Sequence, residues 1–491
     1  MEGVAARAYL SEYFAANIPT IAALDARSLH RRLKGHAALS LVLTMWCRQV
    51  LAVGDGQYKG EEGRMTSEVV LMNRQAVAMA ADSAVTISGH EYIKTYQSVD
   101  KLFPLVDGQP VAVMIYNNAE IMSTPWETII SLYRDAMRGR SLDSIDAYAE
   151  DFMNFISGNP DLFPADHQDT EYFKIVAVVF SAIADDFEHQ VQRFQETGGG
   201  RLREHLSSIF EFVVGQLHED YHRFPDDTPR PDLECFPKGT GEQVRRRYSG
   251  EVDQLIQSLI SAVRNEYGSI SVSEQTISRL KDIAVFAATR DAFFEHYTGV
   301  VFAGFGARQK FPSMRSYLTS SVILGILKRK NDRIADMTAN AGPVVQPFAQ
   351  DRMIKTFLTG MDEYQRRFIY GESLKLSVNI ASEVIGAAPN LTEAQRESLF
   401  RNYSENNMRL ALSEFFKSVD GYQYAVHTRP IYRAIGSLPK RELGETAASL
   451  IKLNSFQQKV MHAIETVGGP IDVAVITRNG GLEMKRDKPG L

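Results

Sequence analysis

The clearest hydrophobic pattern in the chain is a pair of short apolar runs close to residue 70. Residues 68–72 and residues 76–81 are almost continuously apolar, and the polar triplet Asn73-Arg74-Gln75 separates them. Two apolar runs around a short polar corner predict a tight antiparallel β-hairpin. Neither run alternates between apolar and polar positions, so we expect both faces of each strand to be buried, as in a sandwich core.

Three polar residues flank this hairpin where its strands begin and end. Thr66 precedes the first strand, Asp82 closes the second strand, and Lys101 precedes a further short apolar segment at 102–105. If the strands pair as predicted, a hydroxyl, a carboxylate and an ammonium group meet at one end of a sheet.

Strand and helix patterns alternate in blocks along the rest of the chain. Strand patterns recur in four segments, 111–121, 299–305, 471–477 and 482–485. Helical patterns dominate about 139–290 and about 314–420, and shorter helices are predicted over 125–137 and 438–453. This order predicts an α+β protein in which two long helical segments interrupt a β-rich core.

The composition narrows the class of protein. With 491 residues, of which 44% are hydrophobic and 23% charged, the chain has room for two or three domains, or for one with large insertions. The net charge of −6 gives no general reason to expect nucleic-acid binding. The two cysteines, Cys47 and Cys235, argue against a disulfide framework and fit a reducing compartment. No apolar run reaches membrane-spanning length, so we expect a cytoplasmic protein with neither nucleic-acid nor membrane partners.

Residues 1–64 differ from the rest of the chain. They combine a mixed helical stretch, a basic patch and the polar tail GDGQYKGEEGR at 54–64. The end of that tail can be encoded almost entirely by purines, and a translated bacterial ribosome-binding site has this composition just before a methionine. We therefore expect the natural chain to start at Met65, which would make residues 1–64 an artefact of the assigned start. The alternative is a real extension or a propeptide.

Several segments, in their order along the chain, resemble the proteasome β-subunits, which are N-terminal nucleophile hydrolases. Thr66-Ser67, AADSAVT at 80–86 and Lys101 before an apolar strand are similar to the opening of that family, with Lys101 a few residues late. Similarity to the family's later strands and glycine turns is found in three further segments: VAVMIYNNAEI at 111–121, VVFAGFGA at 300–307 and VGGPIDVAVITRNGG at 467–481. The chain thus resembles a long proteasome-like protein.

The resemblance implies a fold and an activity. The fold is a four-layer αββα sandwich over residues 65–491, in which helices flank two antiparallel sheets and the two helical segments are large insertions. The activity is cleavage of a peptide or amide bond by an N-terminal threonine. The family needs neither a cofactor nor a metal for this reaction, and we expect a homo-oligomer.

The resemblance also assigns roles to four residues. Thr66 is the expected nucleophile, and a threonine hydroxyl needs a nearby base to take its proton. At a chain terminus that base can be the α-amine, whose unperturbed pKa of about 7.7–8 lies close to the operating pH. Lys101 would disfavour protonation of the amine, and Asp82 would keep Lys101 charged and in place. The backbone N–H of Asn117 would stabilise the oxyanion.

Two departures from the family leave a second interpretation open. The family has glycine at the position of Asn117, although asparagine tolerates positive φ better than most residues. Phe305 replaces the serine inside the later Gly-x-Gly segment, and the family's second aspartate has no identified counterpart. The second interpretation is a proteasome-like scaffold or assembly protein that does not cleave its partners.

A third interpretation arises from the segment His218-Glu219-Asp220-Tyr221-His222. The pattern H-E-x-x-H on a helix places two imidazoles one turn apart for zinc, with the glutamate as general base, as in zinc metallopeptidases. Three features favour a solvated helix face instead. Asp220 is charged, and Pro225 ends the helix early. The sequence also shows no evident third ligand, so that Glu234 or Glu242 would have to be guessed. We expect that neither His218 nor His222 binds a catalytic metal.

Overall fold

The structure, a computed structural model, describes most of the chain from Thr66 onward. The described residues are 66–83, 85–88, 93–96, 99–196, 201–224, 228–294, 297–403, 407–461 and 469–486. The expectations about residues 1–64 and about a start at Met65 lie outside the described residues.

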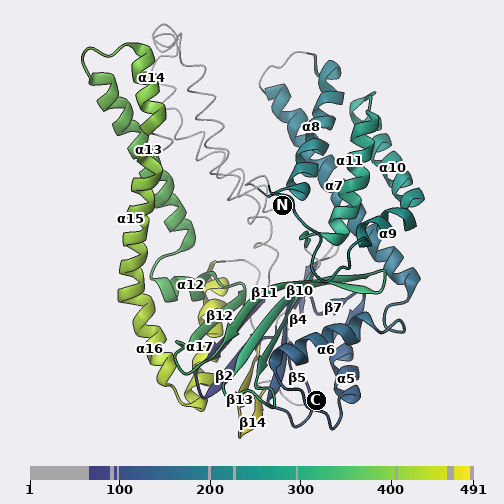
Figure 1. The fold of residues 1–491 in the computed structure, drawn as a ribbon, viewed down its shortest axis with the longest axis vertical. Helices are drawn as coiled ribbons and strands as arrows, with labels where there is room; N and C mark the ends of the chain where they lie inside the picture. Colours follow the sequence, from purple (N-terminus) through teal and green to yellow (C-terminus); the bar gives the residue numbers. More distant parts are fainter. Residues whose placement is uncertain are drawn as a thin grey trace. The chain divides into compact units, whose positions relative to one another are not determined.

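The first of two five-stranded antiparallel sheets contains the predicted hairpin (Figure 1). Its strand order is β12-β1-β2-β13-β14. These strands span Val344–Ala349, Ser67–Met72, Ala76–Asp82, Ile471–Thr477 and Gly481–Lys485, respectively. Strands β1 and β2 pair from Glu68↔Ala81 to Met72↔Val77, and every residue in them is buried. The hairpin prediction is confirmed, and burial on both faces explains why neither strand alternates.

The second sheet has the strand order β11-β10-β9-β6-β5. These strands span Ile326–Asp336, Ser313–Ile323, Thr298–Gly304, Val111–Asn117 and Leu102–Pro104, respectively. The strand patterns at 111–121 and 299–305 correspond to β6 and β9, which pair from Val111↔Gly304 to Asn117↔Thr298. Two short hairpins complete the described strands: β3 (Val85–Ser88) with β4 (Ile93–Tyr96), and β7 (Glu120–Ile121) with β8 (Thr124–Pro125).

The two sheets pack face to face through an apolar core. Val70 and Met79 of the first sheet lie in one buried cluster with Met114 and Val301 of the second sheet. Side chains at alternate positions of a strand point to opposite faces, so the intervening residues of β1 and β2 point outward and must be covered by other elements.

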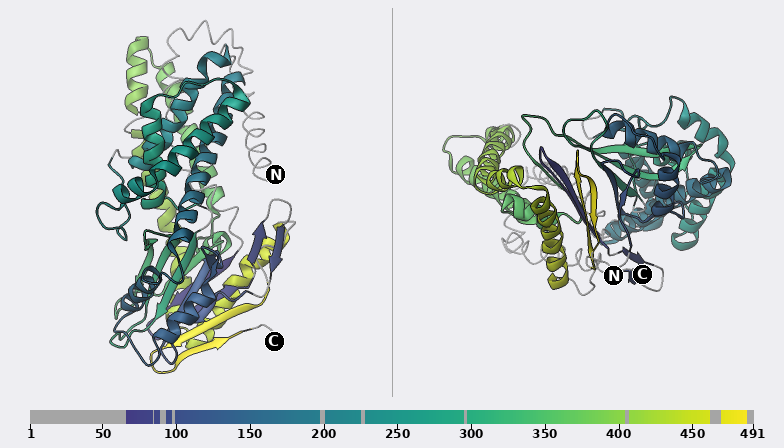
Figure 2. Two further views of the ribbon diagram at one scale, coloured as in Figure 1. Left: turned by 90° about the vertical axis from the view of Figure 1, so that its right-hand side faces the viewer. Right: turned by 90° about the horizontal axis from the view of Figure 1, so that it is seen from below.

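Helices cover the outer face of each sheet, as the view from below in Figure 2 shows. The first sheet is covered by α12 (Arg352–Thr359), α16 (Arg429–Ser437) and α17 (Lys440–Met461). The second sheet is covered by α5 (Trp126–Ala136) and α6 (Ile145–Ser157). The order of layers is therefore helix, sheet, sheet, helix, which confirms the predicted α+β sandwich.

Helices α7 to α11 form a bundle with its own core. They span Ala165–Glu196, Leu202–His222, Thr240–Arg247, Ser249–Tyr267 and Glu274–Thr289. Phe187, Phe210 and Ile283 are fully buried in this core, and Ile323 at the tip of the β10–β11 hairpin joins it. The helical pattern expected at 139–290 thus covers two environments, because α6 belongs to the sandwich and the bundle begins at Ala165.

A second group of helices follows the first sheet's edge strand β12. It comprises α13 (Glu363–Ala387), α14 (Glu393–Asn402), α15 (Met408–Gln423) and the π-helix η2 (Tyr424–Thr428). Within the part of the chain that the structure describes, no helix combines the length and the apolar character needed to cross a membrane.

The expectation of helix over the first part of 314–420 was wrong. Residues 313–323, 326–336 and 344–349 are strands, and the helices begin only at Arg352. The polar residues at 328–333 gave no strand pattern for β11. That strand lies at an edge of its sheet, so several of its side chains are exposed. Its charges are paired instead: Arg329 lies 2.7 Å from Glu150 on α6.

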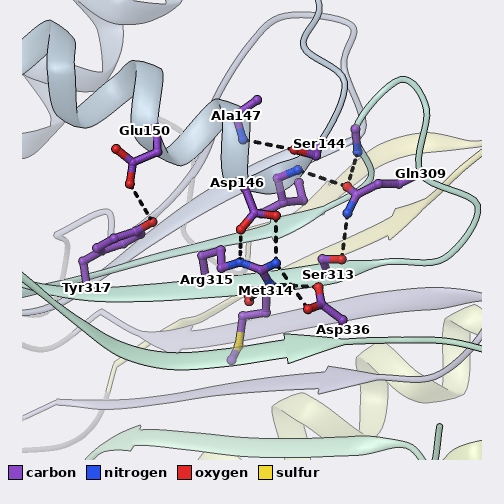
Figure 3. A network of polar contacts seen from close by, with 12 residues as sticks. Ser144, Asp146, Ala147, Glu150, Gln309, Ser313, Met314, Arg315, Tyr317 and Asp336 are labelled. Carbon is purple, nitrogen blue, oxygen red and sulfur yellow. Dashed lines mark hydrogen bonds and ion pairs between the residues drawn. The ribbon is translucent and has the colours of Figure 1, made fainter.

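A buried arginine fixes α6 to the second sheet (Figure 3). Arg315 on β10 donates from Nη2 to Asp146 at 2.7 Å and from Nη1 to Asp336 of β11 at 2.9 Å. Nearby, Gln309 Oε1 accepts from the backbone N–H of Gly306 at 2.8 Å. The charge-assisted contacts of Arg315 connect the first turn of α6 to β10 and to β11 at the edge of the sheet.

Candidate active site

The geometry of the β1–β2 corner places Thr66 and Asp82 at the same edge of the first sheet. Asn73 Oδ1 accepts from the backbone N–H groups of Gln75 at 2.9 Å and Ala76 at 3.1 Å. A side-chain amide that closes its own turn in this way sets the hairpin register. With that register, the residue before β1 and the last residue of β2 meet at one end.

An ion pair joins the end of β2 to the segment before β5. Lys101 Nζ lies 2.6 Å from Asp82 Oδ1, and the same oxygen accepts from the backbone N–H of Ser67 at 3.1 Å. Thr66, Asp82 and Lys101 are 2%, 1% and 3% exposed, respectively. The structure therefore brings the predicted hydroxyl, carboxylate and ammonium groups into one buried cluster.

A fourth side chain, Glu68, lies between the hydroxyl and the ammonium group. Thr66 Oγ1 donates to Glu68 Oε2 at 3.3 Å, and Lys101 Nζ lies 3.4 Å from Glu68 Oε1. Glu68 is fully buried. Burial raises the pKa of its carboxyl to about 8, because loss of water outweighs the attraction of Lys101, and the charge of Asp82 acts in the same direction as burial.

The hydrophobic pattern alone does not reveal Glu68, because this residue stands at the first position of an otherwise apolar run. The signal that could have found it is its residue type. A single ionisable side chain in a strand that is buried on both faces needs a partner, since an unpaired buried charge costs several kcal/mol or changes its protonation state.

The start of β1 is anchored by backbone and amide contacts. The backbone N–H of Gln350, just after β12, donates to the carbonyl oxygen of Thr66 at 3.0 Å. Asn454 on α17 donates from Nδ2 to Ser67 Oγ at 2.9 Å and to the carbonyl oxygen of Gln350 at 2.6 Å. These contacts fix the backbone from which the Thr66 hydroxyl projects.

Asn117 is the last residue of β6, and its backbone φ is 74°. Asparagine thus adopts the left-handed conformation that the sequence analysis considered tolerable here. Because β5 pairs antiparallel with β6 through Leu102↔Met114, Asn117 and Lys101 lie at the same end of the second sheet. Its side-chain Nδ2 donates to the carbonyl oxygen of Tyr297 at 2.6 Å, which ties this turn to the start of β9.

Phe305, where the resemblance to proteasome β-subunits would place a serine, is a core residue. It is 2% exposed and lies in the cluster between the sheets. It offers no hydroxyl group for hydrogen bonding, so this part of the family's site is not reproduced.

The two histidines of the H-E-x-x-H segment lie on α8 in the helical bundle, on a different element from Thr66. His218 Nε2 lies 3.3 Å from Asp282 Oδ2, and the rings of His218 and His222 stack with centroids 5.5 Å apart. Both rings also contact Phe286. Among the described residues, no group of three or more His, Cys, Asp or Glu side chains is placed to hold a metal ion. The expectation that the pair binds no catalytic metal stays a prediction.

The fold defines the class as an α+β protein with two stacked antiparallel sheets and helices on both outer faces. No family model and no curated protein sequence matches the chain. A similar solved structure is that of Anbu, as the Gly-1 mutant from Hyphomicrobium sp. strain MC1. That likeness covers 86% of this chain and 86% of that chain, at 9% identity and a TM-score of 0.26. At these values it says nothing about individual residues, so any function must be argued from the site itself.

Proposed function

We propose that the protein is an amide-bond hydrolase in which Thr66 is the nucleophile and a peptide or related amide is the substrate. The observation that carries the proposal is the buried cluster in which the Lys101–Asp82 ion pair lies at the start of β1, next to the position of Thr66. A hydroxyl, an ammonium and a carboxylate in one water-poor place are the groups that acyl transfer to a hydroxyl requires.

Each residue has a distinct part in the proposed reaction. Thr66 Oγ1 attacks the carbonyl carbon of the substrate, and the α-amine of Thr66 takes the hydroxyl proton when Thr66 is the first residue. Lys101 supplies positive charge that disfavours protonation of that amine, and Asp82 holds Lys101 in place. The backbone N–H of Asn117 is the proposed oxyanion donor. No cofactor takes part, and the expected homo-oligomeric state is open to measurement by light scattering.

The first test is the intact mass of the protein isolated from its own host. We expect a mature chain that begins at Thr66, because the initiator methionine is readily removed when a small residue such as threonine follows it. Self-cleavage after Met65 is the less favoured route, since the family has glycine there, whose backbone bends more freely. Detection of peptides from residues 1–64 in the mature protein would contradict this expectation.

The second test is Thr66→Ala in a chain that starts at Met65. The substitution removes the attacking oxygen but leaves the amine, and loss of a covalent nucleophile costs several orders of magnitude in rate. Lys101→Ala should be comparably inactive, and Asp82→Asn should fall between this variant and wild type. The measurements are hydrolysis of a panel of fluorogenic peptides and labelling by a threonine-directed electrophile. A Thr66→Ala variant that cleaves as fast as wild type would refute the proposal.

One observation favours the second candidate, a scaffold that does not cleave. Thr66 is 2% exposed and its hydroxyl donates to Glu68. A substrate can therefore reach the Thr66 hydroxyl only after the residues that bury it have moved. If the wild-type protein has Thr66 as its first residue but neither cleaves nor is labelled, the scaffold becomes the better interpretation.

A further inference from the structure

The hydroxyl of Thr66 contacts an acidic side chain, and this contact does not require Thr66 to be the first residue of the chain. While Met65 is attached to Thr66, the nitrogen of Thr66 is part of a peptide bond and cannot act as a base. The hydroxyl nevertheless donates to Glu68 Oε2 at 3.3 Å, and this carboxyl belongs to the same strand segment, two residues further on.

The carboxyl of Glu68 is held with one oxygen toward the nucleophile and the other toward a cation. Its Oε1 lies 3.4 Å from Lys101 Nζ and, within the described residues, accepts no hydrogen bond that meets normal geometry. Lys101 is in turn held by Asp82 at 2.6 Å. A nucleophile that contacts a base, which is itself oriented by a third group, is the arrangement that activates hydroxyl nucleophiles.

We propose that Glu68 accepts the proton of the Thr66 hydroxyl, so that this hydroxyl is activated even while Met65 precedes it. The inference rests on the proposed role of Thr66 as nucleophile. It adds a catalytic residue to that site and removes the requirement for a terminal amine.

The proposed step balances without any further reactant. The O–H bond of Thr66 breaks, its proton moves to the Glu68 carboxylate, and Oγ1 bonds to the carbonyl carbon while the carbonyl π electrons move onto oxygen. When the tetrahedral intermediate collapses, the C–N bond breaks and Glu68 returns the proton to the leaving amine. A water molecule then hydrolyses the Thr66 ester, with Glu68 again accepting and returning the proton.

The charges around Glu68 determine when it can act. The charged groups that face it are Lys101, from the segment before β5, and Asp82, from the end of β2. Burial and Asp82 raise the pKa of Glu68 to about 8, while Lys101 lowers it. The carboxyl is therefore mostly protonated at neutral pH and becomes a base as the pH rises through about 8.

The chain offers a matched control, Asp472 on β13. Both Glu68 and Asp472 pair in register with Ala81, one from each side, and residues opposite each other in a sheet share a face. Asp472 is 1% exposed. Asp472→Asn therefore removes an equally buried carboxyl from the same face of the sheet, on the strand beyond β2 from the proposed nucleophile–base pair.

The experiment compares wild type, Glu68→Gln, Glu68→Asp and Asp472→Asn in the full chain. Two rates are measured between about pH 6 and about pH 9.5: labelling of Thr66 by a β-lactone and hydrolysis of fluorogenic peptides. This pH range extends below and above the pKa values that general bases have in enzymes. Peptide mass spectrometry locates the label and shows whether Thr66 has a free amine. Thermal unfolding confirms that each variant is folded.

We expect the wild-type rate to rise through about pH 8 with Met65 still attached, and Asp472→Asn to follow the same profile. Glu68→Gln should be at least about 100-fold slower and lose this rise, because a general base contributes about 100-fold or more. Glu68→Asp should keep a pH-dependent rise at a reduced rate, which a purely structural role would not produce.

Three results would overturn the inference, and they can be told apart. If Glu68→Gln keeps the wild-type rate and pH profile, Glu68 is not the base. If Thr66 is labelled only after it becomes the first residue, the amine is the base and Glu68 is not needed. If wild type with Thr66 as first residue is inert at every pH, the proposed function itself fails, and the role of Glu68 fails with it.

Discussion

At the scale of single residues, the candidate site is buried away from solvent. Lys101, Asp82 and Glu68 are each at most 3% exposed, so one ammonium group is shared by two carboxyl groups. Two carboxylates and one ammonium out of water would leave a net negative charge, which is costly to bury. The raised pKa of Glu68 is the consequence, because a neutral carboxyl can sit beside the ion pair without that cost.

This protonation makes stability depend on pH. The pKa of Glu68 is 4.5 in its ordinary state and about 8 in the fold, so below pH 4.5 the carboxyl is protonated whether or not the chain is folded. Its contribution to the free energy of unfolding is complete there and is lost as the pH rises through about 8, with a slope of at most about 1.4 kcal/mol per pH unit.

We therefore expect Glu68→Gln, which is neutral at every pH, to lose less stability than wild type between about pH 5 and about pH 8. The measurement is urea unfolding at a series of pH values, with Asp472→Asn as the control for removal of a buried carboxyl. Parallel curves for Glu68→Gln and wild type would show that Glu68 does not titrate in this range.

The sequence predicted part of this site and could not predict the rest. The hairpin pattern places Thr66 and Asp82 at the same end of two strands, whereas Lys101 was predicted from its position before the next apolar segment and from the resemblance to proteasome β-subunits. Asn454, which holds Ser67 from 387 residues away in the sequence, follows no local pattern. Its position depends on how α17 packs on the first sheet, and that packing is a property of the folded chain.

At the scale of elements, two glycines, the last residue of β9 and a residue of the loop after it, allow neighbouring backbone segments to approach closely. A Cβ on Gly304 would lie 2.1 Å from the carbonyl oxygen of Pro110, and φ at this glycine is 143°. A Cβ on Gly306 would lie 2.3 Å from Ser144 Cα and 2.4 Å from the carbonyl oxygen of Asp143. The loop after β9 therefore touches the backbone before α6 directly, which only glycine permits.

We expect Gly306→Ala to destabilise the protein by about 2 kcal/mol or more, because backbone rather than a flexible side chain opposes the new methyl group. Gly371→Ala is the control, since nothing lies within 4 Å of its Cβ position on α13. That change should be neutral or stabilise by up to about 1 kcal/mol, through helix propensity. Thermal or urea unfolding measures both, and equal effects at the two sites would contradict the close packing.

The sequence pattern predicted helix where β10, β11 and β12 lie, and β11 shows the reason. Its partner β10 is mostly buried, but β11 contains consecutive charged residues at 328–330. Lys328 is nonetheless 1% exposed, because its Nζ donates to the carbonyl oxygens of Ala287 at 2.7 Å and Ala292 at 2.5 Å. A pattern analysis counts such a lysine as a surface residue, and only the surrounding carbonyl groups show that it is not.

At the scale of the whole molecule, metal content separates two of the possible functions. We expect purified protein to contain less than stoichiometric zinc, because His218 Nε2 faces Asp282 and no described third ligand lies in place. Elemental analysis of wild type, His218→Ala and His222→Ala measures this directly. If wild type contains stoichiometric zinc and each of the two substitutions removes it, the metallopeptidase interpretation is supported.

The long β10–β11 hairpin belongs to the sandwich at its base and to the helical bundle at its tip. Near the tip, Ile323 lies in the bundle core and the backbone N–H of Gly325 donates to Gln168 Oε1 on α7 at 2.7 Å. Opening either core must therefore break part of the other, so the two should behave as a single cooperative unit in native-state hydrogen exchange. Amide hydrogens beside Ile323 should exchange as slowly as those beside Met314 at the base, and a bundle that exchanges much earlier would show that the hairpin transmits no such constraint.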